Sequence, residues 1–302
     1  MKALERNCGS TCDFTMDRAQ YNSSNGVVFF PYYMPYFHAT YPKRYSEDQV
    51  FVMCEREPPT KDLRMELPND YFNATSTFLA HSDIPFPYGH YEKKGDTGTR
   101  IAFYRNLMAE IKTKTKGVFK VFSHCYTPSR RENIITELQN HMEIDLFGRC
   151  SNRTCDKACF AENTKKYRFY LAFENSNCVD YITEKFFQFD NLVPVVLKKE
   201  YYQQFPAKSY IAVDDFINLK SLATYLTYLM ENDDAYAQHL MWKYEYRRKM
   251  VDPSERICAI CDYIAQNRVK KSYKNMKEYW NHATTCDIFF TENVLKRNEA
   301  LT

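Results

Sequence analysis

Glycine is scarce in this chain, and so are long apolar runs. Only 7 of the 302 residues are glycine, and neither G-x-G-x-x-G nor G-x-x-x-x-G-K occurs. Both motifs use glycine to bring the backbone close to a phosphate, so their absence argues against a glycine-fingerprint dinucleotide site and a P-loop. The longest strongly apolar run, residues 192–197, is far shorter than the about 20 residues that a membrane-spanning helix needs. The sequence therefore predicts no membrane span.

A strong charge of either sign is also missing. The chain has 41 lysines and arginines against 38 aspartates and glutamates, which leaves a formal charge of +3. This balance excludes a generally basic nucleic-acid coat protein and an acidic disordered chain. At 44% hydrophobic residues and 302 residues in length, the chain can bury the cores of two ordinary domains or of one large one.

Cysteine, in contrast, is abundant. There are 11 cysteines, several closely spaced, and three N-glycosylation sequons begin at Asn22, Asn73 and Asn152. Together these features favour disulfides and the secretory pathway. Residues 1–6 nevertheless lack the apolar core of a signal peptide, so we expect a chain without its native N-terminal anchor. A zinc clamp at Cys258-x-x-Cys261 in a cytosolic protein is the alternative, although no second pair at finger-like spacing or nearby histidine pair supports it.

The hydrophobic pattern predicts two α/β units with a boundary near residue 116. Residues 1–115 contain short predicted strands at 27–30 and 50–53 and a helix over 101–111. After residue 116, apolar strands alternate with amphipathic helices, which indicates βαβ units and a buried parallel sheet. The predicted strands there are 118–122, 144–147, 169–173, 193–197 and 211–213, and the helices 130–141, 180–189, 218–231, 234–250 and 255–267.

The segment around residue 175 carries the most chemistry. The strand 169–173 runs directly into Glu-Asn-Ser, and Asp180 is placed to cap the next helix. In parallel sheets ligands bind at the carboxyl ends of strands, where helix N-termini meet anions. Tyr181 and Glu184 would share one helix face, with Glu184 suited to accept sugar hydroxyls and Lys185 to hold a phosphate. The alternative is a capped helix with a surface Glu–Lys pair.

This segment resembles the signature of the α1,3/4-fucosyltransferases. The matching residues are Tyr-Arg-Phe-Tyr-Leu-Ala-Phe-Glu-Asn-Ser at 167–176, Asp-Tyr-Ile-Thr-Glu-Lys at 180–185 and Val-Pro-Val-Val-Leu at 193–197. The segments 82–89, 209–216 and 258–261 match in order as well, so the resemblance covers roughly residues 8–285. The cysteine-rich segment 150–159 is similar to the invertebrate branch of the family.

The resemblance implies an inverting, GDP-fucose-dependent enzyme of the GT-B type, with two Rossmann-like α/β domains facing across a cleft. Residues 1–115 would bind the acceptor, residues 116–270 would bind the donor, and residues 271–302 would form a tail that packs back on the body. In such an enzyme Glu57 would be the general base, with Glu55 the alternative two residues away.

The resemblance also implies a set of donor-binding residues. Arg131 and Lys185 match residues that contact the donor phosphates, and Glu184 matches the ribose-binding glutamate. Arg168 stands where the family usually has lysine. The remaining positions that match the donor pocket are Ser123, Asn175 and Tyr181.

The resemblance predicts no tightly bound cofactor and no strict need for a divalent metal. No Asp-x-Asp motif occurs, and cationic side chains can neutralise a leaving diphosphate in place of a metal. Asp214-Asp215 looks like a metal site, but we expect it to cap the helix that begins near residue 218. By the same resemblance, the two cysteines Cys8 and Cys12 pair with Cys258 and Cys261.

We therefore predict an α1,3-fucosyltransferase that transfers fucose from GDP-fucose to GlcNAc of a glycan on N-linked glycoproteins. Its partners would be this donor and a glycan or glycoprotein acceptor, with no nucleic acid. Its compartment would be the Golgi lumen, where relatives are type II membrane proteins whose anchor is absent from this sequence. The segment between Lys185 and Pro194 is shorter than usual, and Lys198 replaces a usual glycine. A non-catalytic glycan- or nucleotide-binding relative is therefore the alternative.

Overall fold

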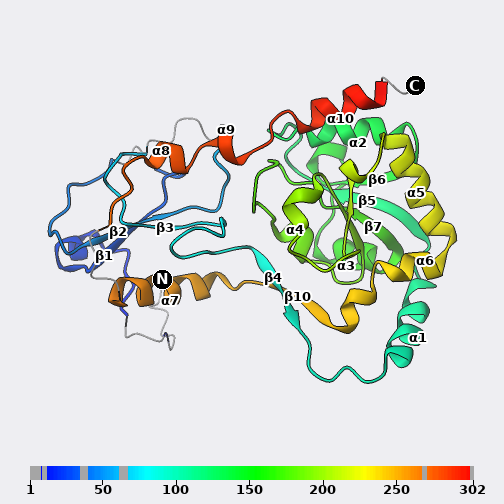
Figure 1. The fold of residues 1–302 in the computed structure, drawn as a ribbon, viewed down its shortest axis with the longest axis horizontal. Helices are drawn as coiled ribbons and strands as arrows, with labels where there is room; N and C mark the ends of the chain where they lie inside the picture. Colours follow the sequence, from blue (N-terminus) through cyan, green and yellow to red (C-terminus); the bar gives the residue numbers. More distant parts are fainter. Residues whose placement is uncertain (1–7, 9–11, 35–39, 61–66, 267–270, 300–302) are drawn as a thin grey trace. The chain divides into compact units, whose positions relative to one another are not determined.

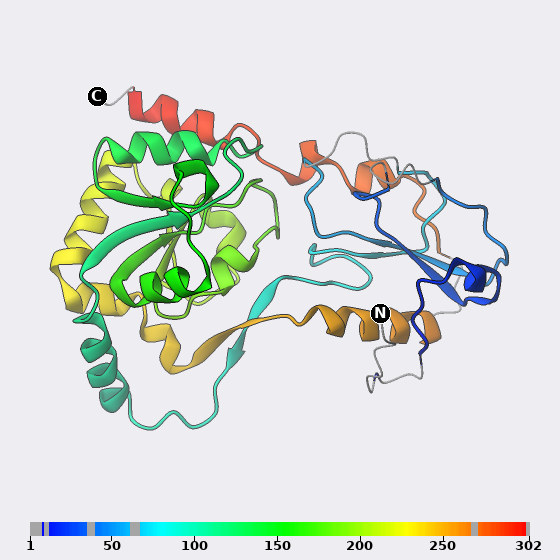
Figure 2. The ribbon, with the colours of Figure 1, turned by 180° about the vertical axis from the view of Figure 1, so that it is seen from behind.

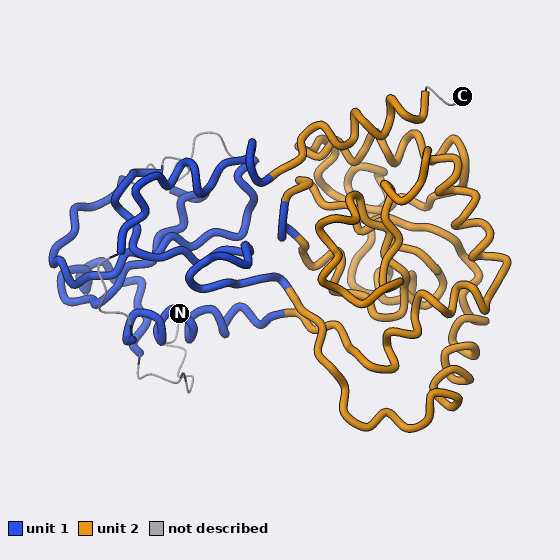
Figure 3. The backbone as a smooth tube through the Cα atoms, in the orientation of Figure 1, with its two compact units in different colours: residues 1–88, 179–181, 251–285 blue, residues 89–178, 182–250, 286–302 orange. Residues whose placement is uncertain are grey.

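The computed structural model describes residues 8, 12–34, 40–60, 67–266 and 271–299, which form two compact units. Unit 1 comprises residues 1–88, 179–181 and 251–285, and unit 2 comprises residues 89–178, 182–250 and 286–302 (Figure 3). The predicted domain limits, 1–115, 116–270 and 271–302, divide the chain at other points. The acceptor and donor roles that the resemblance implied for the two halves stay predictions.

Unit 1 contains a small parallel sheet in the order β1-β2-β3. Its strands are β1 (Gly26–Phe29), β2 (Val50–Cys54) and β3 (Ala74–Ser76), and its helices are α7 (Pro253–Gln266), α8 (Met276–Tyr279) and α9 (His282–Thr285). Ile260 of α7 is buried with Val52 and Ala74 of the sheet. Helix and sheet approach closely at Gly26, where a Cβ atom would lie 2.4 Å from Cδ1 of Ile264. The predicted strands at 27–30 and 50–53 are confirmed.

Unit 2 is built on a five-stranded parallel sheet in the order β6-β5-β7-β8-β9 (Figures 1 and 2). The strands are β5 (Lys116–Val121), β6 (Ile144–Phe147), β7 (Tyr167–Leu171), β8 (Val193–Val196) and β9 (Ile211–Ala212). The helices are α1 (Arg100–Ile111), α2 (Arg131–Gln139), α3 (Lys157–Lys166), α4 (Glu184–Phe187), α5 (Leu219–Glu231), α6 (Asp233–Gln238) and α10 (Phe290–Glu299). The parallel α/β class predicted from the alternating pattern is confirmed.

The two faces of this sheet differ in character. On one face Val118, Phe169 and Val195 belong to a core cluster with aliphatic residues of α1, α2, α5 and α10. On the other face Phe119 and Tyr170 pack ring against ring at 5.0 Å, and Phe160 of α3 joins them. Because successive strand residues point to opposite faces, Lys120 shares the side of Val118, where apolar residues are expected.

Two predicted helices are wrong in part. The helix expected over 234–250 ends at Gln238, because residues 246–250 form β10 (Tyr246–Met250) and pair antiparallel with β4 (Gly89–Lys93). Arg248 of β10 is buried and donates to the carbonyl oxygen of Ser209 at 2.8 Å. Such pairing between distant segments outweighs local helical preference.

The helix expected over 180–189 is also much shorter. It is only α4 (Glu184–Phe187), and its N-cap is Thr183 rather than Asp180. Asp180 has a φ of 59°, and its carboxylate accepts the Ala80 amide at 2.9 Å instead of an amide of α4. Similarly, Asn218 rather than the Asp214–Asp215 pair caps α5, while Asp214 accepts the amide of Lys199 at 2.9 Å.

Five disulfides cross-link the described chain. Cys8 pairs with Cys258 and Cys12 with Cys261, as the resemblance implied, so the zinc alternative at Cys258-x-x-Cys261 is wrong. The others are Cys125–Cys150, Cys155–Cys159 and Cys178–Cys286, while Cys54 is a buried free thiol. Among the described residues, no helix has the length and apolar character to cross a bilayer.

The two bridges to α7 close almost the same loop, with sequence separations of 250 and 249 residues. Replacing Cys8 and Cys258 by serine should lower the free energy of unfolding by only roughly 2 kcal/mol, because Cys12–Cys261 still closes the long loop. Replacing all four cysteines should cost at least about 5 kcal/mol in the same chain-entropy model. Urea unfolding measures both values.

Removal of the Cys155–Cys159 bridge, with a separation of 4 residues, is the control for the cost of one short loop. If the fourfold replacement is no more costly than this control, the long-range bridges do not constrain the unfolded chain.

Candidate functional site

Basic side chains converge where β5 and β7 end. Arg131, the first residue of α2, is 2% exposed, and its Nη1 donates to the carbonyl oxygen of Phe173 at 2.7 Å. Lys120 of β5 donates to the same oxygen at 3.2 Å and to that of Leu171 at 2.7 Å. A cation at a helix N-terminus opposes the helix dipole, so the charge of Arg131 does not stabilise α2.

Glu174 organises the segment that follows β7. Its carboxylate is 4% exposed and accepts hydrogen bonds from the amide of Thr183 at 2.8 Å and from the Thr183 hydroxyl at 2.9 Å. The same carboxylate pairs with the ammonium of Lys185 at 2.9 Å. Glu174 therefore fixes both the cap of α4 and the direction of the Lys185 side chain.

Glu184 and Lys185 are held in their charged forms. Burial alone would lower the pKa of Lys185, but the carboxylates of Glu174 and Glu184 outweigh it and raise that pKa above its usual value. Burial alone would raise the pKa of Glu184, but the neighbouring Lys185 ammonium outweighs it and lowers that pKa. Lys185 Nζ lies 3.1 Å from Oε1 of Glu184, so the two form a partly buried ion pair. The alternative of a capped helix with a surface Glu–Lys pair stays open, although Lys185 is largely buried and also contacts Glu174.

Asn175 lies beside this cluster with hydrogen-bonding capacity to spare. Its side chain is 7% exposed, and Oδ1 has no hydrogen-bond partner among the described residues. Its backbone is fixed, because the carbonyl oxygen accepts the amide of Ser129 at 2.9 Å. The Ser129 hydroxyl donates to the Glu174 carbonyl oxygen at 2.8 Å. A buried acceptor without a protein donor is suited to a ligand hydroxyl or N–H.

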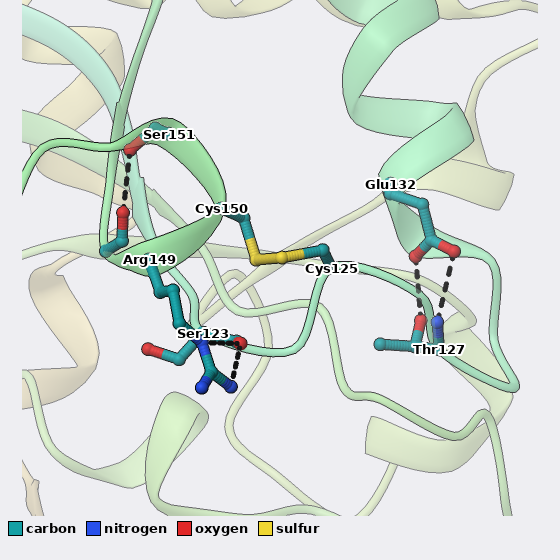
Figure 4. The surroundings of a disulfide bond; sticks show 8 residues. Ser123, Cys125, Thr127, Glu132, Arg149, Cys150 and Ser151 are labelled. Atoms are coloured by element: carbon teal, nitrogen blue, oxygen red, sulfur yellow. Dashed lines mark hydrogen bonds between the residues drawn. A yellow bond between two sulfur atoms is a disulfide. The ribbon is translucent and has the colours of Figure 1, made fainter.

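Ser123 belongs to a loop that is pinned at both ends (Figure 4). Arg149 donates to the Ser123 carbonyl oxygen through Nη2 at 2.9 Å, and the Cys125–Cys150 disulfide ties the loop to the turn after β6. At the other end Glu132 of α2 accepts the Thr127 amide at 3.1 Å and its hydroxyl at 2.9 Å. The loop thus presents the predicted Ser123 on a fixed backbone.

Arg168 is not brought to this cluster. It is the second residue of β7, so Phe173 lies five residues further on, about 16 Å along an extended chain. The guanidinium of Arg168 donates to the Leu229 carbonyl oxygen at 3.0 Å and pairs with Asp233. These contacts join β7 to the end of α5 and the start of α6, which is a structural role. Its predicted donor contact finds no support in this placement.

Lys120 is the member of the cluster that the sequence analysis missed. It is 0% exposed and lies within the predicted strand 118–122. The signal was present, because a lysine interrupts an apolar strand on the side that faces the core. A strand assignment alone does not indicate where such a side chain finds its partners.

Glu57 and Tyr181 belong to unit 1. Glu55 is 3% exposed and accepts the amides of Tyr32, Arg56 and Glu57, so its carboxylate is engaged by the backbone. Glu57 is only partly buried. Tyr181 is buried against the rings of Phe78 and Tyr88, at 5.1 and 6.1 Å. The described residues contain no group of three metal-ligating side chains.

Two family models match most of the chain. The model "Fucosyltransferase, N-terminal" matches residues 2–89, and "Glycosyltransferase family 10 (fucosyltransferase) C-term" matches residues 111–280. Among similar proteins, alpha-(1,3)-fucosyltransferase fut-1 of Caenorhabditis elegans is 30% identical over 91% of this chain and 65% of its own length. Glycoprotein 3-alpha-L-fucosyltransferase A of Drosophila melanogaster is 30% identical over 96% of this chain and 58% of its own length. The chain thus spans about three fifths of these two relatives.

The likeness extends to a shorter human relative and to solved structures. Alpha-(1,3)-fucosyltransferase 7 of Homo sapiens is 30% identical over 89% of this chain and 78% of its own length. A crystal structure of an alpha1,3-fucosyltransferase superposes with a TM-score of 0.52 at 17% identity, over 74% of each chain. At that identity the superposition speaks for the fold alone, an α/β fold with parallel sheets consistent with the GT-B type. On these matches, the chain belongs to glycosyltransferase family 10, the fucosyltransferases.

Proposed function

We propose that this protein transfers fucose from GDP-fucose to a GlcNAc hydroxyl of a glycan, with inversion at the sugar carbon. The observation that carries the proposal is the buried basic cluster where β5 and β7 end, with Arg131, Lys185 and the carboxylate Glu184 in one place. Arg131 and Lys185 suit a diphosphate, because a fully charged cation stabilises the negative charge that develops on the leaving group. Glu184 suits a ribose, because its ionised carboxylate only accepts hydrogen bonds.

The remaining predicted residues complete this proposal. The free Oδ1 of Asn175 and the fixed loop at Ser123 are available to the nucleotide or the sugar. The donor-binding roles of Tyr181 and Arg168 stay predictions from the resemblance. For Arg168 this role is less favoured, because its guanidinium is engaged by residues of α5 and α6. Glu57 would take the proton from the acceptor hydroxyl, while GDP departs without needing a protonated acid. Between the two candidate bases we favour Glu57, because backbone amides occupy the carboxylate of Glu55.

Compartment and acceptor follow from the same proposal. Five disulfides are typical of the secretory pathway, so we place the enzyme in the Golgi lumen, acting on N-linked glycoproteins. GDP release from GDP-fucose in the presence of a defined GlcNAc-terminated glycan, with mass spectrometry of the product, tests the whole proposal. GDP binding without transfer would favour the non-catalytic alternative.

Lys185→Ala should weaken GDP binding. The variant removes a charge-assisted contact to the diphosphate, worth about 1.5–3 kcal/mol, and should raise the Kd roughly 10- to 150-fold. Lys116→Ala is the matched control. Lys116 is a half-exposed lysine at the start of β5, the opposite end of the strand from the basic cluster, and it also forms an ion pair, with Asp145. Calorimetric titration with GDP measures both. If the two variants bind GDP with equal affinity, Lys185 does not contact the diphosphate and its ion pairs are purely structural.

Glu57→Gln should separate catalysis from donor binding. Glutamine keeps the shape of glutamate without its basicity, so kcat should fall at least about 100-fold while the Kd of GDP stays unchanged. Glu55→Gln should instead destabilise the fold by about 1–3 kcal/mol, because its amide NH₂ would face backbone N–H donors. Steady-state transfer rates and thermal unfolding distinguish the two. Near-normal kcat in Glu57→Gln would exclude this residue as the base.

Chelation should leave substantial transfer activity. If cationic side chains neutralise the diphosphate, EDTA should lower kcat less than about 10-fold, whereas loss of an essential metal typically costs far more. Transfer assays with EDTA, and then with added Mn²⁺, measure this. Complete loss with EDTA followed by full recovery with Mn²⁺ would contradict the cationic account.

A further inference from the structure

Lys120 is a wholly buried lysine with no task in the transfer reaction proposed above. Its Nζ donates to the carbonyl oxygens of Leu171 at 2.7 Å and of Phe173 at 3.2 Å. A neutral amine carries two N–H groups, so these two carbonyls satisfy both donors of an uncharged Lys120. Protonation would add a third N–H and a full charge to a group that is 0% exposed.

The charges around Lys120 come from several elements. Arg131 of α2 shares the Phe173 carbonyl oxygen with it, and Lys185 of α4 is a second cation nearby. Glu174 after β7 and Glu184 of α4 oppose these cations, and the ring of Tyr170 in β7 lies 5.1 Å from Nζ. Burial lowers the pKa of Lys120 well below its usual value, Arg131 and Lys185 lower it further, and the two carboxylates only partly offset this.

Three titratable neighbours of Lys120 keep one form. Burial alone would lower the pKa of Lys185, but the carboxylates that face it outweigh burial and raise the pKa. Lys185 is therefore already protonated at neutral pH. Burial alone would raise the pKa of Glu184, but the Lys185 ammonium outweighs burial and lowers the pKa. Glu184 is therefore already ionised. Burial raises the pKa of Tyr170, so this phenol stays neutral. Lys120 is therefore the group of this set whose charge is free to change.

Resting on the function proposed above, we propose that Lys120 takes up a proton when a nucleoside diphosphate binds beside Arg131 and Lys185. The diphosphate brings at least two negative charges to the two cations that disfavour a charged Lys120. Their repulsion is then offset, and the balance at Nζ shifts toward the ammonium form. The proton comes from solvent and returns to it when the nucleotide leaves. Lys120 would thus be a positioning residue, held against Phe173 together with Arg131, whose charge follows the occupancy of the donor site.

Proton uptake by Lys120 couples GDP binding to pH. Because the bound state holds the extra proton, GDP affinity should weaken as pH rises between the free and the bound pKa of Lys120. The slope is at most tenfold per pH unit for one proton. Above about pH 7.5 the terminal phosphate of GDP, with a pKa near 6, is already ionised and contributes little.

The experiment is calorimetric titration of the intact protein with GDP at and above about pH 7.5, in buffers that differ in ionisation enthalpy. The wild-type protein should take up as much as one proton per GDP, with a Kd that rises with pH. Lys120→Met should show neither effect and still bind GDP. Circular dichroism and thermal unfolding establish that the variant is folded.

Lys114→Met is the matched control. Lys114 is also a buried lysine bound to two carbonyl oxygens, those of Thr164 and Tyr167, but it lies at the amino end of β7. Burial lowers its pKa to about 8. This variant should keep the proton uptake of the wild type. Uptake lost equally in both variants would show that the proton does not reside on Lys120.

The outcomes separate this inference from the proposed function. GDP that fails to bind at any pH overturns the proposed function itself. GDP that binds the wild-type protein without net proton uptake, and with a Kd independent of pH, overturns only the role of Lys120. That second result needs no variant, so it stands even if Lys120→Met does not fold.

Discussion

Basic side chains are buried at the carboxyl edge of the five-stranded sheet, and the carboxylate of Glu174 compensates their charge. This carboxylate lies among Lys120, Arg131 and Lys185, and it contacts Lys185 directly at 2.9 Å. Removing one partner of a buried pair leaves an uncompensated charge and typically costs about 3–5 kcal/mol. Without Glu174 the amide of Thr183 would also lose its acceptor, and with it the start of α4. The order of the site therefore follows from one buried ion pair.

The scarcity of glycine shapes how this edge is built. A glycine-rich loop offers backbone N–H groups to a phosphate, whereas this chain brings cationic side chains and bends its backbone at other residue types. Arg130, the N-cap of α2, has a φ of 49°, in the left-handed region that costs a non-glycine residue about 1 kcal/mol or more. That turn directly precedes Arg131. Strain in the backbone is thus located where the basic residue has to enter the cluster.

Local pattern and distant pairing explain which features the sequence could predict. The five parallel strands of unit 2 and helices α1, α2 and α5 follow from apolar periodicity, and the motif match pointed to Arg131, Glu184 and Lys185. The strand β10 could not be predicted, because its pairing with β4 joins segments about 150 residues apart. Asn73 looked like a sequon, yet Oδ1 accepts the Phe51 amide and Nδ2 donates to the Lys271 carbonyl oxygen. Only the fold shows that its amide is already used.

Two disulfides restrain the loops that follow β5 and β7 at the carboxyl edge of the five-stranded sheet. Cys125 follows Ser123 in the loop after β5, and its bridge to Cys150 joins that loop to the turn after β6. Cys178 follows Asn175 in the segment after β7, and its bridge to Cys286 fixes that segment to the start of the last helical region. Binding is more favourable when the groups that meet a ligand are already ordered, since the entropy of ordering them is not lost again. The two loops that would receive the nucleotide are therefore ordered by bonds that are typical of an oxidising compartment. Compartment and site are linked through this chemistry: a reducing environment would loosen the backbone around Ser123 and Asn175 while leaving the Glu174–Lys185 pair intact.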